Sequence, residues 1–202
     1  MRIMHVIASL DPAQGGPPVV ARNLAAAQAA LGHDVRLAAE VVVGTNPVPT
    51  VSLPRDSAAA LWKRPHAANM ELVRSADVLH LHGVWEPVLL AIGKAARKAG
   101  VPYVIAPHGM LDPWSLSQKK WKKRLALALG FRTMLNRAAG LHVLNADERD
   151  LLTPLGLTAP CQIVPNGIFL TEFDPPPDPR RFRDRRPGPG ERPFVLFLSR
   201  LH

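Results

Sequence analysis

Two adjacent glycines, Gly15 and Gly16, lie between a short apolar run at residues 3–10 and a helix predicted to open at Pro17 and Pro18. Without a Cβ the backbone there can approach an anion closely, and the first N–H groups of a helix carry the positive end of its dipole. Proline suits the first helical turn because the N–H that it lacks has no partner within the helix. The pattern therefore predicts a phosphate-binding turn, and the alternative is the tight turn that any strand-to-helix junction needs.

Three histidines stand at the ends of later apolar runs. His80 and His82 close the run that begins at residue 78, and His108 follows the run at 101–106. A histidine in a loop after a strand either orients a bound ligand or is a hydrogen-bonded structural residue. We expect His80 and His82 on opposite faces of their strand, with His82 at the ligand site and His80 packed. No third ligand stands at a recognisable spacing, so we predict no metal site.

The elements that must position these residues are short apolar runs separated by helical or turn-rich sequence. This alternation predicts an α/β fold, a Rossmann-like doubly wound parallel sheet with right-handed crossovers. Residues 41–65 show no clear period and are predicted as a long surface loop with at most one helical piece. The predicted strands are 3–10, 33–40, 78–81, 101–106, 141–144 and 162–164, and the predicted helices are 18–31, 87–98 and one or two helices within 114–139.

Two helix ends carry local signals. Gly32 is placed to end the first helix. Asn145 and Glu148, three residues apart, match an N-cap and capping-box pattern for a helix through Leu152, and we interpret both as structural. The first helix is expected to bury the face formed by Val20, Leu24, Ala27 and Leu31.

The composition changes sharply after residue 173, where proline and arginine dominate and apolar periodicity ends. Such a segment is typical of a linker. The buried-type run at 194–198 then begins a new strand, and in an open α/β sheet further elements should follow it. We therefore expect an N-terminal Rossmann-like domain at 1–173, an interdomain linker at 174–193, and the first strand of a truncated second domain at 194–202.

Composition bounds the class of protein. A chain of 202 residues with 47% hydrophobic residues can bury a core, and Cys161 is its single cysteine, which excludes an internal disulfide. No apolar run approaches the roughly 20 residues that span a bilayer, and no secretion signal is recognisable. We therefore expect the protein to be located in the cytoplasm. The formal charge of +9 is compatible with binding to nucleic acid, to anionic lipid or to phosphorylated substrates. The alternative is that the charge only contributes to solubility.

Two segments supply much of that charge, 119–124 and 180–192. The first lies in a predicted helix beside Trp114 and Trp121, which are expected to share a face with Leu125 and Leu129. A basic, aromatic-tipped helix can lie on an anionic bilayer. The alternative is a solvated helix whose tryptophans enter the core. The basic residues are Lys119, Lys120, Lys122, Lys123 and Arg124.

Several stretches in order and spacing carry a resemblance to a known family. They are M-R-I-M-H-V-I with the glycine turn, A-L-G-H-D-V at 30–35, H-L-H-G-V-W at 80–85, A-P-H-G-M-L-D-P-W at 106–114, V-P-N-G-I at 164–168 and V-L-F-L-S-R-L-H at 195–202. The chain resembles the N-terminal half of the retaining glycosyltransferases of family 4, which have the two-domain GT-B fold. The fourth of these, A-P-H-G-M-L-D-P-W, is similar to stretches in enzymes that build bacterial polysaccharides.

The resemblance implies roles for particular residues. Gly15 and Gly16 would face the donor diphosphate, with Arg200 pairing with the same phosphates, and His108 would contact the transferred sugar as the catalytic residue. Asn166 and Gly167 would mark the crossing between domains. A lysine and two glutamates of the family would lie beyond His202, so we expect the chain to be inactive alone. Candidates for the acceptor site are His82, Trp85 and Trp114, although the two tryptophans fit a packed rim equally well.

The implied function is transfer of a sugar, with retention, from a nucleotide-diphosphate sugar to a glycan or lipid-diphosphate acceptor, without a cofactor. We expect peripheral association with the inner face of the cytoplasmic membrane. The alternative is a non-catalytic acceptor-binding subunit that works with a separate donor-domain chain. A dinucleotide-binding dehydrogenase domain is disfavoured because the glycine spacing is wrong, although Glu40 offers the acid. A nucleic-acid-binding module is disfavoured because no binding motif is recognisable.

Overall fold

The computed structural model describes residues 1–55, 67–176, 178, 180–185, 195 and 197. The chain divides into two compact units, Met1–Gly167 and Ile168–His202. The described part of the second unit holds the short helices η5 (Leu170–Phe173) and α8 (Arg180–Arg185), and most of the strand expected at 194–198 lies outside the described residues.

The first unit is built on one sheet of seven strands, every neighbouring pair of which is parallel. The strand order is β3-β2-β1-β4-β5-β6-β7, so the chain winds one way from β1 and then returns to wind the other way. This confirms the doubly wound, Rossmann-like α/β sheet. The strands are β1 (Arg2–Ser9), β2 (Asp34–Val41), β3 (Thr50–Ser52), β4 (Val78–His82), β5 (Tyr103–Ala106), β6 (Gly140–Val143) and β7 (Cys161–Ile163).

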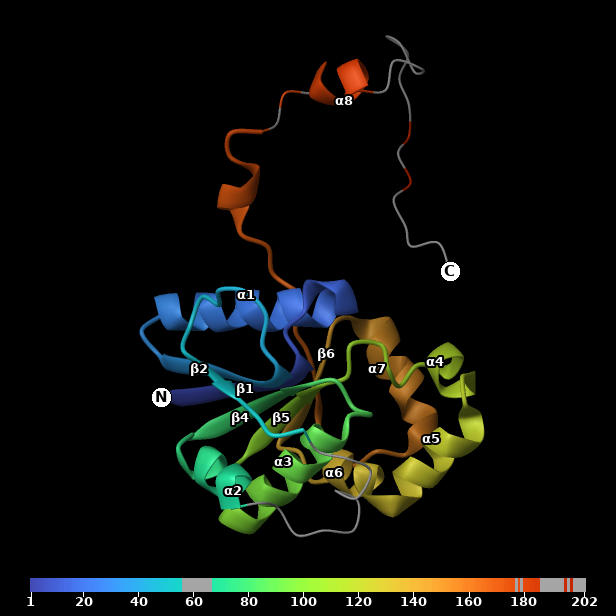
Figure 1. Ribbon diagram of the computed structural model, residues 1–202. Helices are drawn as coiled ribbons and strands as arrows, with labels where there is room; N and C mark the ends of the chain where they lie inside the picture. Colours follow the sequence, from blue (N-terminus) through green and yellow to red (C-terminus); the bar gives the residue numbers. More distant parts are fainter. Residues whose placement is uncertain (56–66, 177, 179, 186–194, 196, 198–202) are drawn as a thin grey trace. The chain divides into compact units, whose positions relative to one another are not determined.

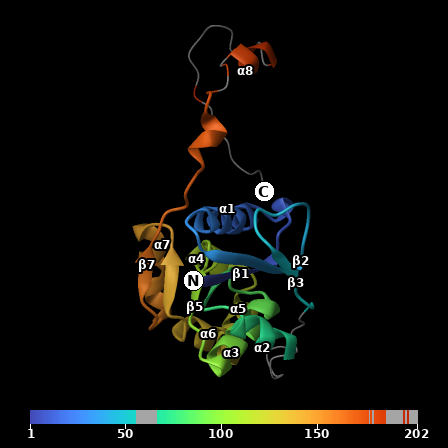
Figure 2. The ribbon, with the colours of Figure 1, turned by 90° about the vertical axis from the view of Figure 1, so that its left-hand side faces the viewer.

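Helices cover both faces of this sheet. Figure 1 shows α1 (Gly16–Ala30) above the sheet, and α2 (Ala67–Arg74), α3 (Pro87–Ala99) and α6 (Arg132–Asn136) below it. Figure 2, turned by 90°, keeps the same layers. The remaining helices are η1 (Pro12–Gln14), α4 (Pro113–Ser117), α5 (Lys120–Ala126), the π-helical segment η3 (Leu127–Phe131), α7 (Ala146–Leu152) and η4 (Thr153–Leu155).

Two buried apolar clusters hold these layers together. The larger one packs α3 and α6 against the lower face of the strands, and the smaller one packs α1 against β1 and β2. At the larger cluster, Gly93 lets α3 approach α6 closely, since a Cβ at this position would lie 2.9 Å from Cγ of Met134. The sheet is therefore clamped on both sides, and its strand ends are rigidly placed.

The first helix ends as predicted but buries a different face. Gly32 has a φ of 86°, its N–H donates to the carbonyl of Ala29, and the N–H of His33 donates to Gln28, which is a Schellman ending. Its buried residues are Pro18, Ala21 and Ala25, whereas Leu31 is 77% exposed. The prediction that the helix buries its larger side chains was wrong, because its small residues face the sheet and let the helix pack closely against it.

Two other segments differ from expectation. Within residues 41–65, the described part contains the strand β3, which pairs in parallel with β2. The segment 114–139 forms four short helical elements instead of one or two helices. Lys119, with a φ of 51°, separates α4 from α5, and Gly130, with a φ of 140°, makes a kink inside the π-helical segment η3.

Candidate functional site

The predicted ligand-binding residues gather at one edge of the sheet. Since all strands are parallel, their carboxyl ends meet there, with β1 ending at Ser9, β4 at His82, β5 at Ala106 and β6 at Val143. The strand order reverses between β1 and β4, and open α/β sheets bind ligands in the crevice outside such a reversal. The glycine turn follows β1 and His108 follows β5, so both lie at this carboxyl edge.

The glycine turn is shaped by a small 3-10 helix, η1. Asp11 caps it by accepting the N–H of Ala13, and Gly15 closes it with its own N–H donating to the carbonyl of Pro12 at 3.0 Å. Gly15 has a φ of 108°, a backbone conformation that favours glycine. Of the two glycines expected to face the donor diphosphate, Gly15 therefore already uses its N–H within the turn.

Gly16 is the residue of this turn with a donor to offer. Pro17 and Pro18 have no N–H, so of the first three residues of α1 only Gly16 carries one. A Cβ built on Gly16 meets no heavy atom within 4 Å, so the space beside it is open. A phosphate could therefore approach the backbone closely at this point.

His108 is held in an unusual backbone conformation by two neighbours. Its φ is 52°, in the left-handed region that non-glycine residues rarely adopt. Its Nε2 lies 3.1 Å from Nδ1 of His82, and the N–H of the next residue, Gly109, donates to Oε1 of Glu148 at 2.8 Å. The imidazole is only partly buried, so it lies at the surface of the carboxyl edge. Such strain commonly marks positions where geometry matters for function.

The carboxylate of Glu148 binds groups other than the cap N–H that a capping box predicts. Asn145 does cap α7, since its Oδ1 accepts the N–H of Glu148 at 2.8 Å. The carboxylate of Glu148, however, accepts the N–H of Leu144 at 2.7 Å as well as that of Gly109. The side chain is 9% exposed and ties the end of β6 to the loop that carries His108. Sequence spacing could not show this second contact, because Gly109 is 39 residues away.

The histidines of β4 lie on the same face of the sheet, so the expectation of opposite faces was wrong. Residues two apart in a strand point the same way, and the rings of His80 and His82 stack at 4.4 Å between centroids. His5 of β1 and His142 of β6 complete the cluster: Nδ1 of His5 lies 2.9 Å from Nε2 of His82, and Nδ1 of His142 lies 3.2 Å from Nε2 of His80.

Burial favours the uncharged form of His5, His80, His82 and His108. Desolvation lowers the pKa of His5 to about 4 and that of His108 to about 4, and it holds the pKa of His80 and of His82 well below the ordinary value. Two protonated rings in this cluster would also repel each other, which lowers the pKa of His80 and of His82 further. The carboxyl edge thus presents neutral imidazole, not imidazolium.

Three of these histidines bring possible metal ligands together. Among the described residues, ligand nitrogens of His5, His80 and His82 lie within 4.8 Å of one another. Both ring nitrogens of His5 and of His82 already lie at hydrogen-bond distance from other side chains. A metal would have to break these contacts, so the absence of a metal site stays our prediction.

The acceptor-site candidates fall into different environments. His82 is 2% exposed, which places its ring against His5 and His108 and out of reach of a ligand. Trp85 is partly buried, and its Nε1–H donates to the carbonyl of Met110 at 3.1 Å. Trp114 is 68% exposed on α4. Direct contact with an acceptor is therefore open to Trp114 and to the outer face of Trp85 only.

Sequence reasoning missed Glu86, which follows β4 and precedes α3. Its Oε2 is buried without a hydrogen-bond partner among the described residues, and burial raises the pKa of the carboxyl. A Cβ on Gly83 would lie 3.0 Å from this oxygen. The only sequence signal was an acidic residue before a helix that opens with Pro87, which is also an ordinary helix start.

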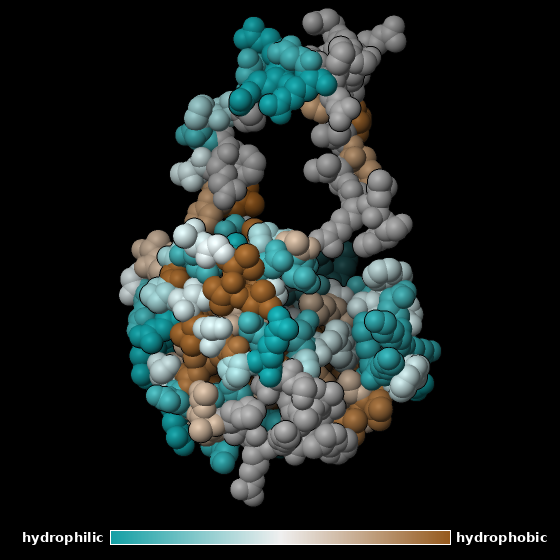
Figure 3. Space-filling view, in the orientation of Figure 1, coloured by the Kyte–Doolittle hydropathy of each residue, from teal (hydrophilic) through white to brown (hydrophobic). Residues whose placement is uncertain are grey.

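A second feature of the first unit is the cationic end, which we define as Lys119, Lys120, Lys122, Lys123 and Arg124 with Trp114 and Trp121. Both tryptophans are 68% exposed and Leu125 is 50% exposed, so the interpretation in which the tryptophans enter the core was wrong. Figure 3 shows hydrophilic side chains over the end of the molecule where α4 and α5 lie, with apolar ones beside them.

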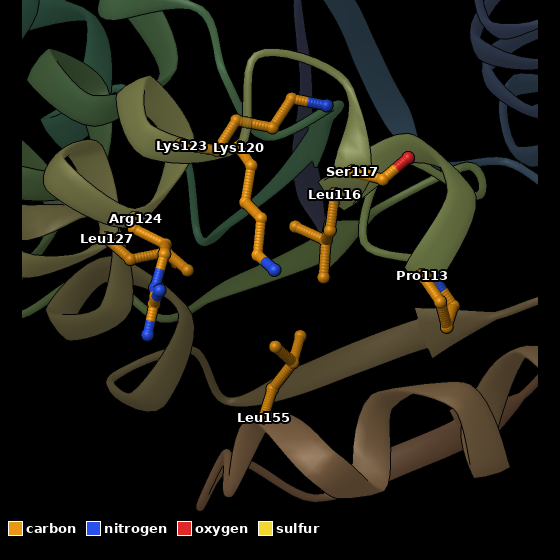
Figure 4. Close-up of a pocket in the computed structure, with 8 residues that line it drawn as sticks. All are labelled: Pro113, Leu116, Ser117, Lys120, Lys123, Arg124, Leu127 and Leu155. Carbon is orange, nitrogen blue, oxygen red and sulfur yellow. The ribbon is translucent and has the colours of Figure 1, made fainter.

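A pocket of about 320 Å³ opens beneath the cationic end. Figure 4 shows Lys120 and Leu116 pointing toward each other above Leu155, which comes from η4. Lys123 points away, and its Nζ bonds the carbonyl of Ser115 at 2.6 Å and lies 5.3 Å from the ring centre of Trp85. The pocket thus combines an apolar floor with a cationic rim.

The last predicted residues lie at or beyond the end of the first unit. Asn166 and Gly167 close this unit, and the division of the chain falls directly after Gly167. Arg200 lies outside the described residues. Among the described residues, no helix is both long and apolar enough to cross a membrane.

Comparisons with known proteins agree with this geometry. The family model described as a glycosyl transferase 4-like domain matches residues 15–167. A GDP-mannose-dependent alpha-(1-6)-phosphatidylinositol monomannoside mannosyltransferase of Mycolicibacterium smegmatis is 30% identical over 159 residues, which cover 75% of this chain and 37% of that protein. The chain thus spans little more than a third of this curated relative.

Solved structures share the fold. Anabaena Alr3699/HepE in complex with UDP-glucose is 16% identical with a TM-score of 0.66, over 94% of this chain and 50% of that one. A glycosyltransferase from Rickettsia africae is 15% identical with a TM-score of 0.66, over 100% of this chain and 53% of that one. The chain belongs to the glycosyl transferase 4-like family, and it corresponds to the N-terminal, Rossmann-like part of a GT-B glycosyltransferase.

Proposed function

We propose that this chain forms the acceptor-side part of a retaining glycosyltransferase that moves a sugar from a nucleotide-diphosphate sugar to a glycan or lipid-linked acceptor. The observation that carries the proposal is that the Gly16 N–H and the strained His108 both lie at the carboxyl edge of the sheet, after β1 and β5, where the strand order reverses between β1 and β4. The names of its relatives support it, since one uses GDP-mannose and another was solved with UDP-glucose.

In this reaction these residues stabilise charge and orient the substrates, and none of them forms a covalent bond to the sugar. The departing diphosphate needs charge stabilisation, and the Gly16 N–H at the positive end of α1 supplies part of it, with Arg200 as the proposed partner. The acceptor hydroxyl must be held against the anomeric carbon while water is kept out. In a front-face attack the leaving phosphate takes the acceptor's proton, so no general base is assigned. His108 orients the sugar.

The acceptor side is proposed to be the cationic end. Its pocket pairs leucines with Lys120 and Arg124, a combination that suits an amphiphile with a phosphate group. Exposed Trp114 and Trp121 beside the lysines would place α5 on an anionic bilayer. The protein would then be peripheral to the inner face of the cytoplasmic membrane, where a lipid-diphosphate acceptor lies.

Binding of the nucleotide sugar tests the role of His108. Calorimetric titration of the chain together with any continuation of its reading frame is expected to show binding of GDP-mannose or UDP-glucose. His108→Ala should weaken that binding about tenfold while leaving the matching nucleoside diphosphate unaffected. Ser117→Ala on α4 serves as the control. Equal weakening for the nucleotide and the nucleotide sugar would contradict a contact between His108 and the sugar.

Transfer assays separate the two forms of the proposal. The chain is assayed for hydrolysis and transfer alone, and with any continuation of its reading frame. Activity only with that continuation supports one enzyme. Activity that requires a separately encoded donor-domain chain supports the alternative, an acceptor-binding subunit. Activity of the 202-residue chain alone would overturn its expected inactivity.

A further inference from the structure

A series of hydrogen-bonded side chains runs from α1 to His108, across three elements. Nε2 of His5 lies 2.7 Å from Oε1 of Gln28, and Nδ1 of His5 lies 2.9 Å from Nε2 of His82. Nδ1 of His82 then lies 3.1 Å from Nε2 of His108. We call Gln28, His5, His82 and His108 the histidine series. It uses both ring nitrogens of its two inner members.

Each contact in this series determines the next. A neutral imidazole has one N–H and one bare nitrogen, so a ring that donates through one nitrogen must accept at the other. The oxygen of Gln28 accepts, so Nε2 of His5 carries the hydrogen and Nδ1 accepts from Nε2 of His82. Nδ1 of His82 must then accept from Nε2 of His108. At the end of the series, Nδ1 of His108 is left bare.

We propose that His5 and His82 are positioning residues that hold His108 as its Nε2–H tautomer, so that its bare Nδ1 accepts a hydrogen bond from a hydroxyl of the bound sugar. The reference to a sugar rests on the proposed function, whereas the tautomer stands on the hydrogen-bond geometry alone. A bare nitrogen selects a donor such as a hydroxyl and disfavours an anionic oxygen. The site would therefore be selective for a neutral sugar at this position.

A second series of the same polarity supports the direction. Nε2 of His142 lies 2.8 Å from the backbone carbonyl of Val164, which can only accept. Nδ1 of His142 is then bare and accepts from Nε2 of His80 at 3.2 Å. In this neighbouring pair a backbone group sets the same tautomer that the amide oxygen of Gln28 sets in the first.

The surroundings of the histidine series favour neutral rings and fix the orientation of His108. Desolvation lowers the pKa of His5 and of His108 to about 4, although the carboxylate of Glu148 opposes the shift at His108. The N–H of Gly109 is held by Glu148, and among the described residues no hydrogen bond reaches Nδ1 of His108. The ring of His108 is thus fixed at Nε2 and at its backbone, with Nδ1 left for a ligand.

The test is the tautomer itself, read from the ring ¹⁵N shifts of the histidines in long-range ¹H–¹⁵N correlation spectra at pH 7. The full chain without ligand is expected to show a protonated Nε2 and a bare Nδ1 at His5, His82 and His108. Gln28→Leu removes the oxygen that sets the direction, so His108 should become a mixture of both tautomers. Its matched control is Gln162→Leu, which lines the same pocket of about 370 Å³ but lies outside the series.

A protonated Nδ1 at His108 in the unchanged chain would overturn the proposal, and so would a His108 tautomer that Gln28→Leu leaves unchanged. A shift in both variants would overturn it as well, because the effect would then come from the pocket and not from the series. None of these spectra needs a substrate. A failure of nucleotide-sugar binding would count against the proposed function alone, because the spectra of the chain without ligand would still report the tautomers of the histidine series.

Discussion

The carboxyl edge and the cationic end hold their polar groups in opposite ways. At the carboxyl edge His5, His82 and Glu148 are each at most 9% exposed, and their polar atoms bond one another or the backbone. At the cationic end the tryptophans are 68% exposed, and among its cations Lys123 is the one seen bonded to the backbone of another helix. The first region is preorganised, whereas the second depends on what it meets.

This difference separates two kinds of specificity. A preorganised edge selects by geometry, because its groups lose little entropy when a ligand binds. An exposed cationic surface selects by charge and apolar contact, and its strength falls with salt. Sugar transfer to a lipid-linked acceptor needs both, one for the reacting atoms and one for the location. Changes at the edge should therefore alter folding, and changes at the cationic end should leave folding intact.

The largest expected effect is acid destabilisation that originates at the carboxyl edge. The folded pKa of His5 and of His108 is about 4, below the ordinary 6.5, so the unfolded chain binds more protons between these values. Stability is then complete above about pH 6.5 and falls as pH drops toward 4, by about 1.4 kcal/mol per pH unit for each group. His80 and His82 act in the same direction.

Urea unfolding followed at pH 7, 6, 5 and 4.5 measures this slope. The variant His108→Gln has one titrating group fewer, so its free energy of unfolding should fall less steeply with decreasing pH. A pH-independent stability across this range would contradict neutral burial of the histidines. It would also remove the contrast between a buried edge and an exposed cationic end.

The next effect concerns the carboxylate that ties the edge together. Glu148→Ala leaves the N–H groups of Gly109 and Leu144 without their partner, and we expect a loss of about 2–4 kcal/mol in the free energy of unfolding. Asp150→Ala, on the exposed side of the same helix, should cost less than about 0.5 kcal/mol. Equal losses in the two variants would show that the edge is not specially preorganised.

The cationic end should respond in binding and not in stability. Replacing Lys120, Lys122 and Arg124 by glutamine should weaken binding to vesicles containing phosphatidylglycerol at least tenfold, at about 1 kcal/mol per charge, with the unfolding free energy unchanged. Lys123 is retained because it bonds Ser115. The control removes three exposed charges elsewhere, Arg74, Arg97 and Lys98, in α2 and α3. If both triple variants lose binding equally, net charge and not this surface attracts the membrane.

How far the sequence predicts these regions depends on the range of the interactions. The strands and their parallel order follow from local apolar runs, and the Gly32 and Asn145 helix ends follow from neighbouring residues. The contact between Glu148 and Gly109 joins residues 39 apart and leaves no periodic trace. The stacking of His80 on His82 was available from strand alternation, but its continuation to His5 required the pairing of β1 with β4.

Other differences have local physical causes. The strand β3 has three residues and is held by pairing with β2, so its own sequence shows no alternation long enough to recognise. The first helix buries Ala21 and Ala25 because small side chains let it pack close to the sheet, which larger side chains on that face would prevent. The exposure of Trp121 follows from the interruption between α4 and α5 at Lys119. The sequence gives no signal for the positive φ of Lys119.

The smallest effect is expected where the two regions meet, at Trp85. Its Nε1–H donates to the carbonyl of Met110 in the loop after His108, its ring lies 5.9 Å from that of Phe131, and Lys123 of α5 lies over it. Trp85→Phe keeps a ring for Phe131 and Lys123 but removes the hydrogen bond, so we expect a loss of about 1 kcal/mol in unfolding free energy.

If Trp85 links the regions, the same substitution should also alter the ring shifts of His108, whereas Trp121→Phe on the exposed side of α5 should change neither quantity. Unfolding curves and histidine spectra of the two variants give the comparison directly. A normal His108 signal in Trp85→Phe would mean that the carboxyl edge is positioned without help from α5. In that case a membrane or acceptor bound at the cationic end would have no structural route through Trp85 to the reacting sugar.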